Sequence, residues 1–397
     1  MNTALFVSIK VFLLINSEFL CYCLLCNLSI VVMSETIEIK ADNYSVHIGG
    51  LKTGVLSDLI HSKYDSSDCY ILVDENTKEH CLPKLRDLFA DNGSGNQIGI
   101  VEIPAGEEHK TLETVTSIER HLSTHNASRG AVLINLGGGV VCDVGGFAAS
   151  IYKRGIDFIN VPTTLLSQVD ASIGGKVGVD LDGLKNYLGV FKNPAAVYID
   201  PSFLTTLEQK EVIAGYAEVI KHALIADNEY LGRIREHDLG VGPQSMESWK
   251  AIIEQSVNIK NRIVTEDPRE EGVRKALNFG HTIGHALESF YLGTDTPLLH
   301  GEAVAIGMVC ELYLSSVLTG FGGETRDDVC SYLSAIYQEK QLDLSSYNEY
   351  IASMYADKKN RDGRINFTLL TAIGSPLIDQ YVDEESIRQA LDYYRSL

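Results

Sequence analysis

One segment constrains the fold of this chain more than any other: residues 131–150, which read AVLINLGGGVVCDVGGFAAS. An apolar run typical of a fully buried strand, Ala131–Leu136, leads directly into three consecutive glycines, and an apolar stretch of helical character follows. Glycines at a strand–helix junction let the backbone approach a pyrophosphate, and the first turn of the helix offers free N–H groups. Because the spacing is not GxGxxG, the segment predicts either a dinucleotide site or a tight turn without a ligand.

Strand-like and helix-like segments alternate on both sides of this junction. Strands separated by helices are typical of a parallel sheet with helices on both faces. We therefore expect an α/β domain over residues 34–200. An amphipathic pattern predicts a helix at Leu112–His121, and short apolar runs predict further strands at Cys69–Asp74, Gln97–Ile103, Phe158–Val161 and Ala196–Ile199.

The pattern changes after Pro201, where apolar residues recur with the helical period. We expect a second, helical domain over residues 201–397, in which strand character returns only at Ile365–Leu370. The expected helices are Leu207–Ile225, Met246–Val264, Lys275–Phe290, His300–Leu318 and Glu324–Tyr337.

Residues 1–33 differ from the rest of the chain. They are mostly apolar, and Lys10 and Glu18 divide them into pieces shorter than the roughly 18 residues of a membrane span. They also lack the basic start and the small-residue cleavage site of a signal peptide. Since MSETIEIK is an ordinary cytosolic N-terminus, we favour a dispensable extension, with translation starting at Met33. A signal or anchor and a structured N-terminal piece are the alternatives.

The composition limits the partners of this protein. Lys and Arg number 33 and Asp and Glu number 53, so the formal charge is −20, and a surface this acidic repels nucleic acid and anionic membranes. A small anionic substrate stays possible, because a few cations in one cleft reverse the local field. The cysteines after residue 33 are scattered without a CxxC pair, which indicates reduced thiols in a cytosolic protein.

Potential metal ligands cluster in the expected helical domain. His281 and His285 in NFGHTIGHALE lie one helical turn apart on the same face, His300 opens HGEAVAIGM, and Glu218 lies in GYAEVIKHALI. One Glu and two His leave coordination positions open on Zn²⁺, which is typical of a catalytic site. The segment is not the metalloprotease motif HExxH, since Thr282 replaces the Glu. Histidines satisfied within the core or at the surface are the alternative.

Basic side chains interrupt apolar and glycine-rich segments of this acidic protein. Lys and Arg in such surroundings favour binding of a phosphate or a carboxylate, although each alone also fits a solvated surface charge. Asp74 ends a predicted strand, where an acidic residue commonly binds a nucleotide ribose. The basic residues of this kind are Arg154, Lys176, Lys185, Lys221 and Arg274.

Taken in their order along the chain, these motifs resemble those of the 3-dehydroquinate synthase family, which belongs to the sugar phosphate cyclases. The resemblance runs from about Ile37 to the C-terminus. Segments of this length in this order are far more specific than a single glycine loop. The segments that carry the resemblance are GGGVVCDVGGFAAS, YKRGIDFINVPTTLLSQVDASIGGKVGVD, LKNYLGVFKNP, GYAEVIKHALI, EDPREEGVRKALNFGHTIGHALE and HGEAVAIGM.

The resemblance implies a Rossmann-like, NAD-binding α/β domain and an all-α, metal-binding C-terminal domain, with the site in the cleft between them. It implies conversion of 3-deoxy-D-arabino-heptulosonate 7-phosphate to 3-dehydroquinate and phosphate, in the shikimate pathway, with NAD and Zn²⁺ or Co²⁺. It also implies a cytoplasmic homodimer. A cyclase of sedoheptulose 7-phosphate and a metal-dependent polyol dehydrogenase are the alternatives, but SIGGKVGVD and LKNYLG favour the dehydroquinate synthase.

The resemblance further assigns roles to individual residues. It makes Glu218, His281 and His300 the metal ligands and His285 a catalytic residue. The implied NAD contacts are Asp74, Glu107, Lys110, Gly138, Gly139, Asp143, Thr163, Thr164, Lys176, Lys185 and Thr206. The implied substrate contacts are Arg154, Asp170, Lys176, Lys185, Asn186, Lys221, Lys260, Glu270, Arg274 and Asn278, together with Lys358 or Lys359.

Overall fold

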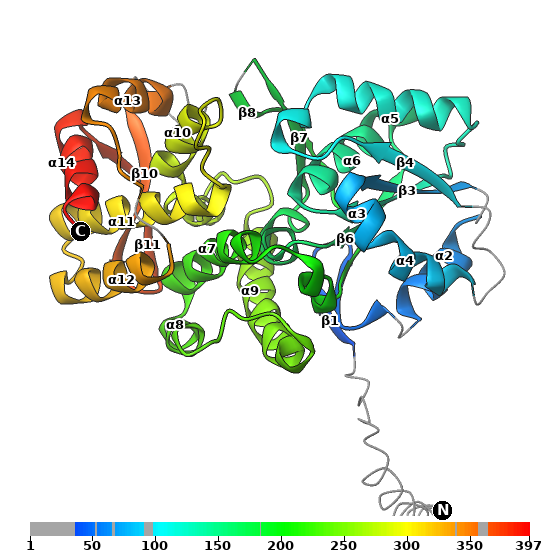
Figure 1. The fold of residues 1–397 in the computed structure, drawn as a ribbon, viewed down its shortest axis with the longest axis horizontal. Helices are drawn as coiled ribbons and strands as arrows, with labels where there is room; N and C mark the ends of the chain where they lie inside the picture. Colours follow the sequence, from blue (N-terminus) through cyan, green and yellow to red (C-terminus); the bar gives the residue numbers. More distant parts are fainter. Residues whose placement is uncertain are drawn as a thin grey trace, which may run out of the picture. The chain divides into compact units, whose positions relative to one another are not determined.

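A seven-stranded sheet forms the first half of the described chain (Figure 1). The computed structural model describes residues 36–51, 54–65, 68–90, 98–182, 184–337, 340–355 and 364–397, so the expected extension at residues 1–33 lies outside it. The strand order is β1-β2-β9-β6-β5-β3-β4, and every neighbouring pair is parallel except β1 and β2. The strands are β1 Ile37–Lys40, β2 Ser45–Ile48, β3 Cys69–Asp74, β4 Gly99–Ile103, β5 Val132–Gly137, β6 Asp157–Pro162 and β9 Ala196–Ile199.

Helices cover both faces of this sheet. Alternate residues of β3 point to opposite faces: Tyr70 and Leu72 pack with α5 and α6, whereas Ile71 and Val73 pack with α2 and α4. The parallel sheet between two helical layers confirms the expected α/β class. The helices are α2 Val55–Lys63, α3 Glu75–His80, α4 Leu82–Ala90, α5 Leu112–Thr124 and α6 Gly139–Ile151.

An antiparallel hairpin, β7 Lys176–Leu181 and β8 Leu184–Phe191, leaves the sheet between β6 and β9. The sequence did not predict it, because most residues of β8 are exposed and show no apolar alternation. Short helical turns complete this half. They are η3 Glu107–His109, η4 Tyr152–Arg154, the π-helical turn η5 Ser167–Ala171 and η6 Pro201–Thr206.

Long helices dominate after residue 200, as expected (Figure 1). One antiparallel hairpin, β10 Ile365–Ala372 and β11 Ser375–Val382, interrupts them, so this half is not entirely helical. The proposed domain boundary near residue 200 stays a prediction. The helices are α7 Gln209–Ala226, α8 Asn228–Arg235, η7 Pro243–Ser245, α9 Met246–Glu266, η8 Val273–Asn278, α10 His281–Tyr291, α11 His300–Leu318, α12 Gly323–Ile336, η9 Leu344–Ser346, α13 Tyr347–Tyr355 and α14 Glu384–Arg395.

The helix expected at Lys275–Phe290 is divided in the structure. The turn η8 ends at Asn278, and Gly280 then adopts a left-handed conformation with φ 80° before α10 begins at His281. Glu311 of α11 accepts the N–H of Gly280 at 2.6 Å, which fixes the start of α10. His281 therefore lies at the first position of a helix rather than in its middle.

Helix α11 is the central helix of the second half and contacts α7, α10, α12, α14 and β10. Among the described residues it is the one helix long and apolar enough to cross a membrane. In the structure, 72% of its apolar window is buried by neighbouring elements. The apolar character of α11 is therefore explained by its place in the protein core.

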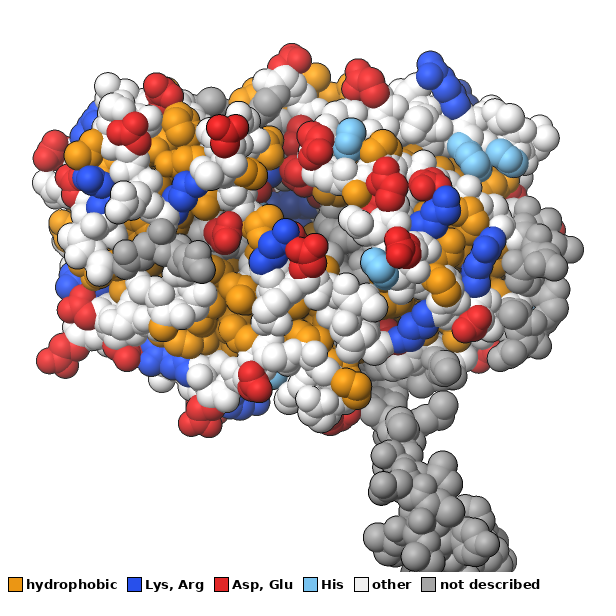
Figure 2. Space-filling model, in the orientation of Figure 1, with side chains coloured by type: hydrophobic (Ala, Val, Ile, Leu, Met, Phe, Trp, Pro, Cys, Tyr) orange, Lys and Arg blue, Asp and Glu red, His pale blue; other side chains and the backbone are white. Residues whose placement is uncertain are grey.

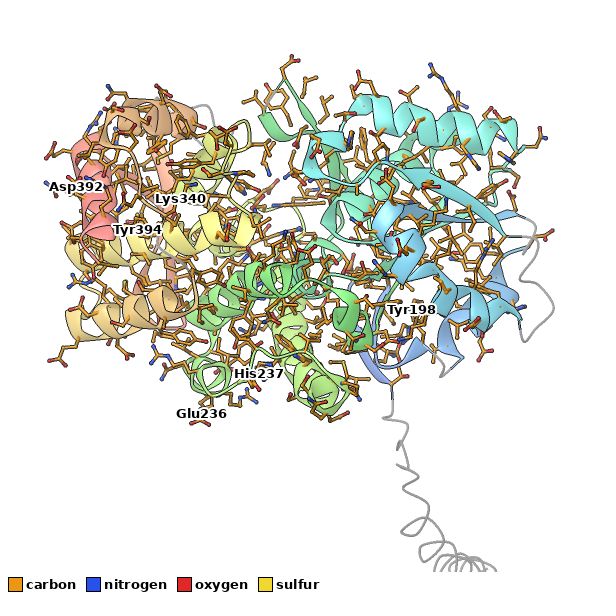
Figure 3. The ribbon with its side chains drawn as sticks, viewed as in Figure 1. Tyr198, Glu236, His237, Lys340, Asp392 and Tyr394 are labelled. Atoms are coloured by element: carbon orange, nitrogen blue, oxygen red, sulfur yellow. The ribbon has the colours of Figure 1, made fainter. Side chains whose placement is uncertain are left out.

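Polar contacts of tyrosines fasten α14 to the rest of this half (Figure 3). The hydroxyl oxygen of Tyr394 accepts the N–H of Lys340 at 2.9 Å, and Tyr347 donates its hydroxyl to Asp392 at 3.0 Å. The C-terminal helix thus packs on α11 through buried apolar residues and is held by these bonds at its edge.

Candidate active site and metal centre

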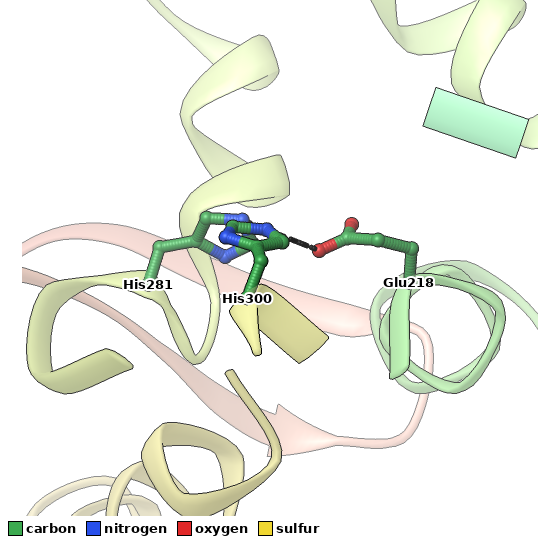
Figure 4. A group of neighbouring side chains, drawn as sticks. All are labelled: Glu218, His281 and His300. Atoms are coloured by element: carbon green, nitrogen blue, oxygen red, sulfur yellow. Dashed lines mark ion pairs between the residues drawn. The ribbon is translucent and has the colours of Figure 1, made fainter. Parts of the chain in front are cut away.

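Three helices each present one potential metal ligand to the same point (Figure 4). Glu218 comes from the middle of α7, whereas His281 and His300 are the first residues of α10 and α11. The Nε2 atoms of both histidines lie 3.4 Å from Glu218 Oε1, and the ligand atoms of all three residues lie within 4.8 Å of one another. The structure thus brings together the residues predicted as ligands.

Glycines bring these helices into backbone contact. A Cβ on Gly301, the residue after His300, would lie 1.7 Å from the carbonyl oxygen of Ala214 on α7. A Cβ on Gly307 would lie 1.9 Å from the carbonyl oxygen of Gly280, at the start of α10. A side chain at either position would push α11 away from its neighbour, so these glycines set the spacing between the three ligands.

The second nitrogen of each imidazole faces an oxygen that only accepts hydrogen bonds. Nδ1 of His281 lies 3.1 Å from the carbonyl oxygen of Phe279, and Nδ1 of His300 lies 3.2 Å from Oε2 of Glu288. Each Nδ1 therefore carries a proton and donates it. In the neutral histidine, the lone pair of Nε2 then points toward Glu218, which is the orientation that a metal ligand requires.

The electrostatics of the cluster favour a cation. Glu218 is completely buried and ion-paired with Lys221, yet no donor meets either carboxylate oxygen with hydrogen-bond geometry. Burial opposes its charge, but Lys221 and His281 hold the pKa of Glu218 well below its ordinary value. Burial also opposes a charged His300, yet Glu288 and Glu218 raise the pKa of His300 to about 10. A buried carboxylate and two imidazole nitrogens therefore fit a divalent ion such as Zn²⁺ or Co²⁺.

Residues predicted to bind NAD follow the carboxyl ends of parallel strands. Asp74 ends β3, Glu107 follows β4, Gly138 follows β5, Thr163 follows β6 and Thr206 ends the turn after β9. Because these strands are parallel, their carboxyl ends lie along one edge of the sheet. The chain runs from β3 to β4 on one side and then crosses to β5 on the other. The crevice at such a reversal is the usual ligand site of an open α/β sheet.

The glycine loop contacts the turn after β6. A Cβ on Gly138 would lie 3.1 Å from Cγ2 of Thr164, and a Cβ on Gly139 would lie 3.4 Å from Cβ of Ala171. Gly138 also has no side chain to cap the free N–H groups in the first turn of α6. Space for a side chain is slightly restricted at Gly138 and not at Gly139. The uncapped helix start suits a pyrophosphate.

Two lysines near the carboxyl-end edge of the sheet donate hydrogen bonds to carboxylates. Lys110 donates to Asp143 at 2.6 Å, and Lys185 donates to Glu107 at 3.0 Å. The carboxylate of Asp74 has another contact, because its Oδ1 accepts an N–H from the first turn of α3 at 2.7 Å. Asp74 therefore caps a helix, a role that its place at the end of a strand did not reveal.

Asp170, in the π-helical turn η5, contacts two lysines predicted to bind substrate. Its Oδ1 accepts a hydrogen bond from Lys260 Nζ at 2.7 Å and lies 3.8 Å from Lys221 Nζ. Burial opposes its charge, but Lys260 and Lys221 hold the pKa of Asp170 well below its ordinary value. The charged carboxylate keeps two buried ammonium groups close together, and such a pair suits a phosphate or carboxylate.

Further predicted substrate residues lie beside the segment between η5 and β7. Arg274 is buried and donates to the carbonyl oxygen of Gly174 at 2.8 Å. Lys176 is ion-paired with Glu270, whose Oε1 accepts a hydrogen bond from Asn278 at 2.9 Å. Residues from both halves of the sequence thus meet here.

Some predicted substrate residues lie apart from the contacts above or outside the described residues. Arg154 lies in η4, at the end of α6 opposite to Gly138, and the length of that helix separates the two by roughly 20 Å. The predicted substrate contact of Arg154 stays a prediction. Asn186 is exposed on β8, where its N–H donates to a carboxylate of β7 at 2.6 Å. Lys358 and Lys359 lie outside the described residues.

Two buried residues next to the site were not predicted. Glu288 contacts His300, and His222 of α7 places its Nε2 3.6 Å from Asp170 Oδ1. Glu288 follows His281 by two helical turns on one face of α10, and this spacing is visible in the sequence. The contact of His222 depends on the fold, because Asp170 lies in the other half of the sequence.

The face in Figure 2 is hollowed between the two halves of the described chain. Lys and Arg side chains lie on the floor of the hollow, and Asp and Glu side chains lie around its rim. A separate cavity of about 600 Å³ lies between β1 and α9, and none of the predicted site residues lines it. Basic side chains thus lie at the floor of this hollow in a protein whose formal charge is −20.

Comparison with known proteins agrees with this geometry. Residues 100–214 match the family described as 3-dehydroquinate synthase N-terminal, and residues 215–360 match the family described as 3-dehydroquinate synthase C-terminal. A 3-dehydroquinate synthase of Parabacteroides distasonis is 45% identical over 341 residues, which are 86% of this chain and 94% of that protein. The chain belongs to the 3-dehydroquinate synthase family. The resemblance inferred from the motifs is thereby confirmed.

Solved structures of related cyclases share the fold. A 2-deoxy-scyllo-inosose synthase complexed with carbaglucose-6-phosphate, NAD⁺ and Co²⁺ has a TM-score of 0.76 and 26% identity, covering 91% of this chain and 99% of that one. The 2-epi-5-epi-valiolone synthase of Streptomyces hygroscopicus, with NAD⁺ and Zn²⁺ bound, has a TM-score of 0.76 and 25% identity with the same coverage. The fold expected for a 3-dehydroquinate synthase is thus confirmed.

Proposed function

We propose that this protein is a 3-dehydroquinate synthase that converts 3-deoxy-D-arabino-heptulosonate 7-phosphate to 3-dehydroquinate and phosphate, with NAD⁺ and Zn²⁺ or Co²⁺ as cofactors. The observation that carries the proposal is the convergence of Glu218, His281 and His300, with the buried Lys221 next to Glu218. The 45% identity to a curated family member over most of both chains supports the same activity.

Glu218, His281 and His300 would hold the metal, and the crevice at the carboxyl ends of β3 and β5 would hold NAD. When bound, the metal supplies Lewis acidity to substrate hydroxyls, and the nicotinamide accepts and returns a hydride. His285 lies on the same side of α10, with its ring centroid 5.0 Å from that of His281 and 5.9 Å from that of His300. We assign His285 the transfer of a proton at a substrate oxygen.

Two buried lysines and one buried arginine would bind the two anionic groups of the substrate. Lys221, Lys260 and Arg274 are buried and contact only carboxylate or carbonyl oxygens in their described hydrogen bonds and ion pairs. A phosphate or carboxylate offers these cations stronger charge-assisted bonds than a carbonyl does. Fixing both ends of the substrate would orient its reacting carbons, which is a major source of rate acceleration.

One assay separates this function from its alternatives. We expect phosphate release from 3-deoxy-D-arabino-heptulosonate 7-phosphate with only catalytic amounts of NAD⁺ and no net NADH, because the hydride returns to the substrate. Phosphate should not be released from sedoheptulose 7-phosphate. Activity on sedoheptulose 7-phosphate alone would make the protein the related cyclase, and accumulation of NADH with a polyol would make it a dehydrogenase.

Replacing Lys260 should weaken substrate binding. We expect Lys260→Met to raise the KM for the sugar phosphate about tenfold or more, since a charge-assisted hydrogen bond is lost and Asp170 keeps its charge. Arg262→Met is the matched control, because Arg262 lies on the exposed side of α9 that lines the cavity next to β1. The control should change KM by less than about twofold. Equal KM values for both variants would exclude Lys260 from the substrate site.

The remaining expectations are also proposals. We propose a homodimer in the cytoplasm, an NAD-binding domain over residues 34–200 and a metal- and substrate-binding domain over residues 201–397. We further propose that the protein has neither nucleic acid nor membrane as a partner, because its formal charge is −20.

A further inference from the structure

A second buried carboxylate stands behind one of the proposed metal ligands. Glu288 lies on α10, and its Oε2 is 3.2 Å from Nδ1 of His300 on α11. Its Oε1 accepts a hydrogen bond from Lys185 Nζ at 2.6 Å. Glu288 is only 5% exposed, so each carboxylate oxygen is committed to one of these two partners.

We propose that Glu288 is a positioning residue of the metal site, an inference that rests on the proposed function. A carboxylate accepts hydrogen bonds and donates none, so its contact fixes the proton of His300 on Nδ1. The lone pair of Nε2 is then turned toward Glu218, and the negative charge of Glu288 makes that nitrogen a stronger ligand. His281 has only a neutral carbonyl oxygen in the same position, so Glu288 distinguishes the two histidines.

Lys185 keeps Glu288 in place without removing its effect on His300. The same Nζ also donates to Glu107 at 3.0 Å, so two carboxylates share one ammonium group. The excess negative charge lies next to His300. A carboxylate that served only to neutralise Lys185 would not need its second oxygen to face an imidazole, whereas a ligand support requires this geometry.

Successive side-chain contacts link His300 to Glu288, Glu288 to Lys185, and Lys185 to Glu107. They begin at the metal cluster, pass through the hairpin β7–β8 and end after β4, at the edge where NAD is proposed to bind. The support of the metal ligand is thus built partly from the sheet half. Removing such a supporting contact usually weakens metal binding by about 10–100-fold.

Zinc affinity tests this proposal without relying on turnover. Glu288→Gln and Glu288→Asp would be compared with the unaltered protein by competition with a chromophoric chelator, in the absence of NAD⁺ and substrate. Glu107→Gln is the matched control, because it removes the other carboxylate on Lys185 but does not touch a histidine of the cluster. The visible spectrum of bound Co²⁺ would report the ligand geometry in each protein.

We expect the Glu288 variants to bind Zn²⁺ about 10–100-fold more weakly and to change the Co²⁺ spectrum. Glu107→Gln should alter zinc affinity by less than about twofold, since it is not hydrogen-bonded to a ligand. Unaltered zinc affinity in either folded Glu288 variant would overturn the proposal, and so would an equal loss in Glu107→Gln. If the unaltered protein itself bound no divalent metal, the proposed function would fail instead, which keeps the two failures distinct.

Discussion

Replacing His281 with alanine should remove both the bound metal and the turnover. The variant would keep one carboxylate and one imidazole at the cluster, too few to hold a catalytic metal. We expect the rate of phosphate release to fall by a factor of roughly 10³ or more, since a Lewis acid contributes several kcal/mol to such a reaction. Metal content by elemental analysis and phosphate release under saturating substrate would measure the two effects.

The control for this experiment lies one turn along the same helix. His285→Asn should retain stoichiometric metal, because the two imidazoles that lie 3.4 Å from Glu218 Oε1 are those of His281 and His300. Its turnover should still fall by about 10²-fold or more, as expected for a lost proton-transfer group. Full metal content in His281→Ala would refute the ligand assignment. Loss of metal from His285→Asn alone would exchange the roles of the two histidines.

The sequence predicted the elements whose burial is uniform. The strands β3, β5, β6 and β9 are buried on both faces, and they read as short apolar runs with little polar interruption. Helix α11 is buried nearly all round, and its predicted bounds agree with the structure. Local composition was sufficient in these cases, because the environment of the element is the same along its length.

Elements that are short, or exposed over most of their length, were missed. Strand β8 is exposed over most of its length, and β1 and β2 contain only four residues each. The division of the helix expected at Lys275–Phe290 depends on Gly280, whose left-handed conformation is fixed by the carboxylate of Glu311 from another helix. These features are determined by tertiary contacts, which no local window of sequence contains.

In the candidate site, too, local sequence could predict some residues, whereas tertiary contacts determine the others. Glu218, His281 and His300 could be predicted because their motifs resemble those of the family. The contacts of Glu288 and His222 could not, since each depends on the packing of one helix against a distant segment. The role of Arg154, which lies in η4 at the other end of α6 from Gly138, stays a prediction of its motif.

The glycine contacts between α10 and α11 predict a large loss of stability. In Gly307→Ala, the added Cβ would lie 1.9 Å from the carbonyl oxygen of Gly280 and 2.9 Å from the amide nitrogen of Gly284, both backbone atoms. Neither atom can rotate away, so the two helices must separate. We expect a destabilisation of about 3 kcal/mol or more, seen as a fall in Tm of roughly 5 °C or more.

The same separation should reach the metal centre, because Gly280 immediately precedes His281. We therefore expect Gly307→Ala also to weaken zinc binding, measured by chelator competition. Gly232→Ala in α8 is the matched control: its Cβ would meet no atom within 4 Å. Since alanine favours a helix over glycine, this control should gain about 0.5–1 kcal/mol and leave zinc affinity unchanged. If Gly307→Ala matched the control in both stability and zinc affinity, α10 and α11 could separate with no loss of free energy. The backbone contact at Gly307 would then not determine the distance between His281 and His300.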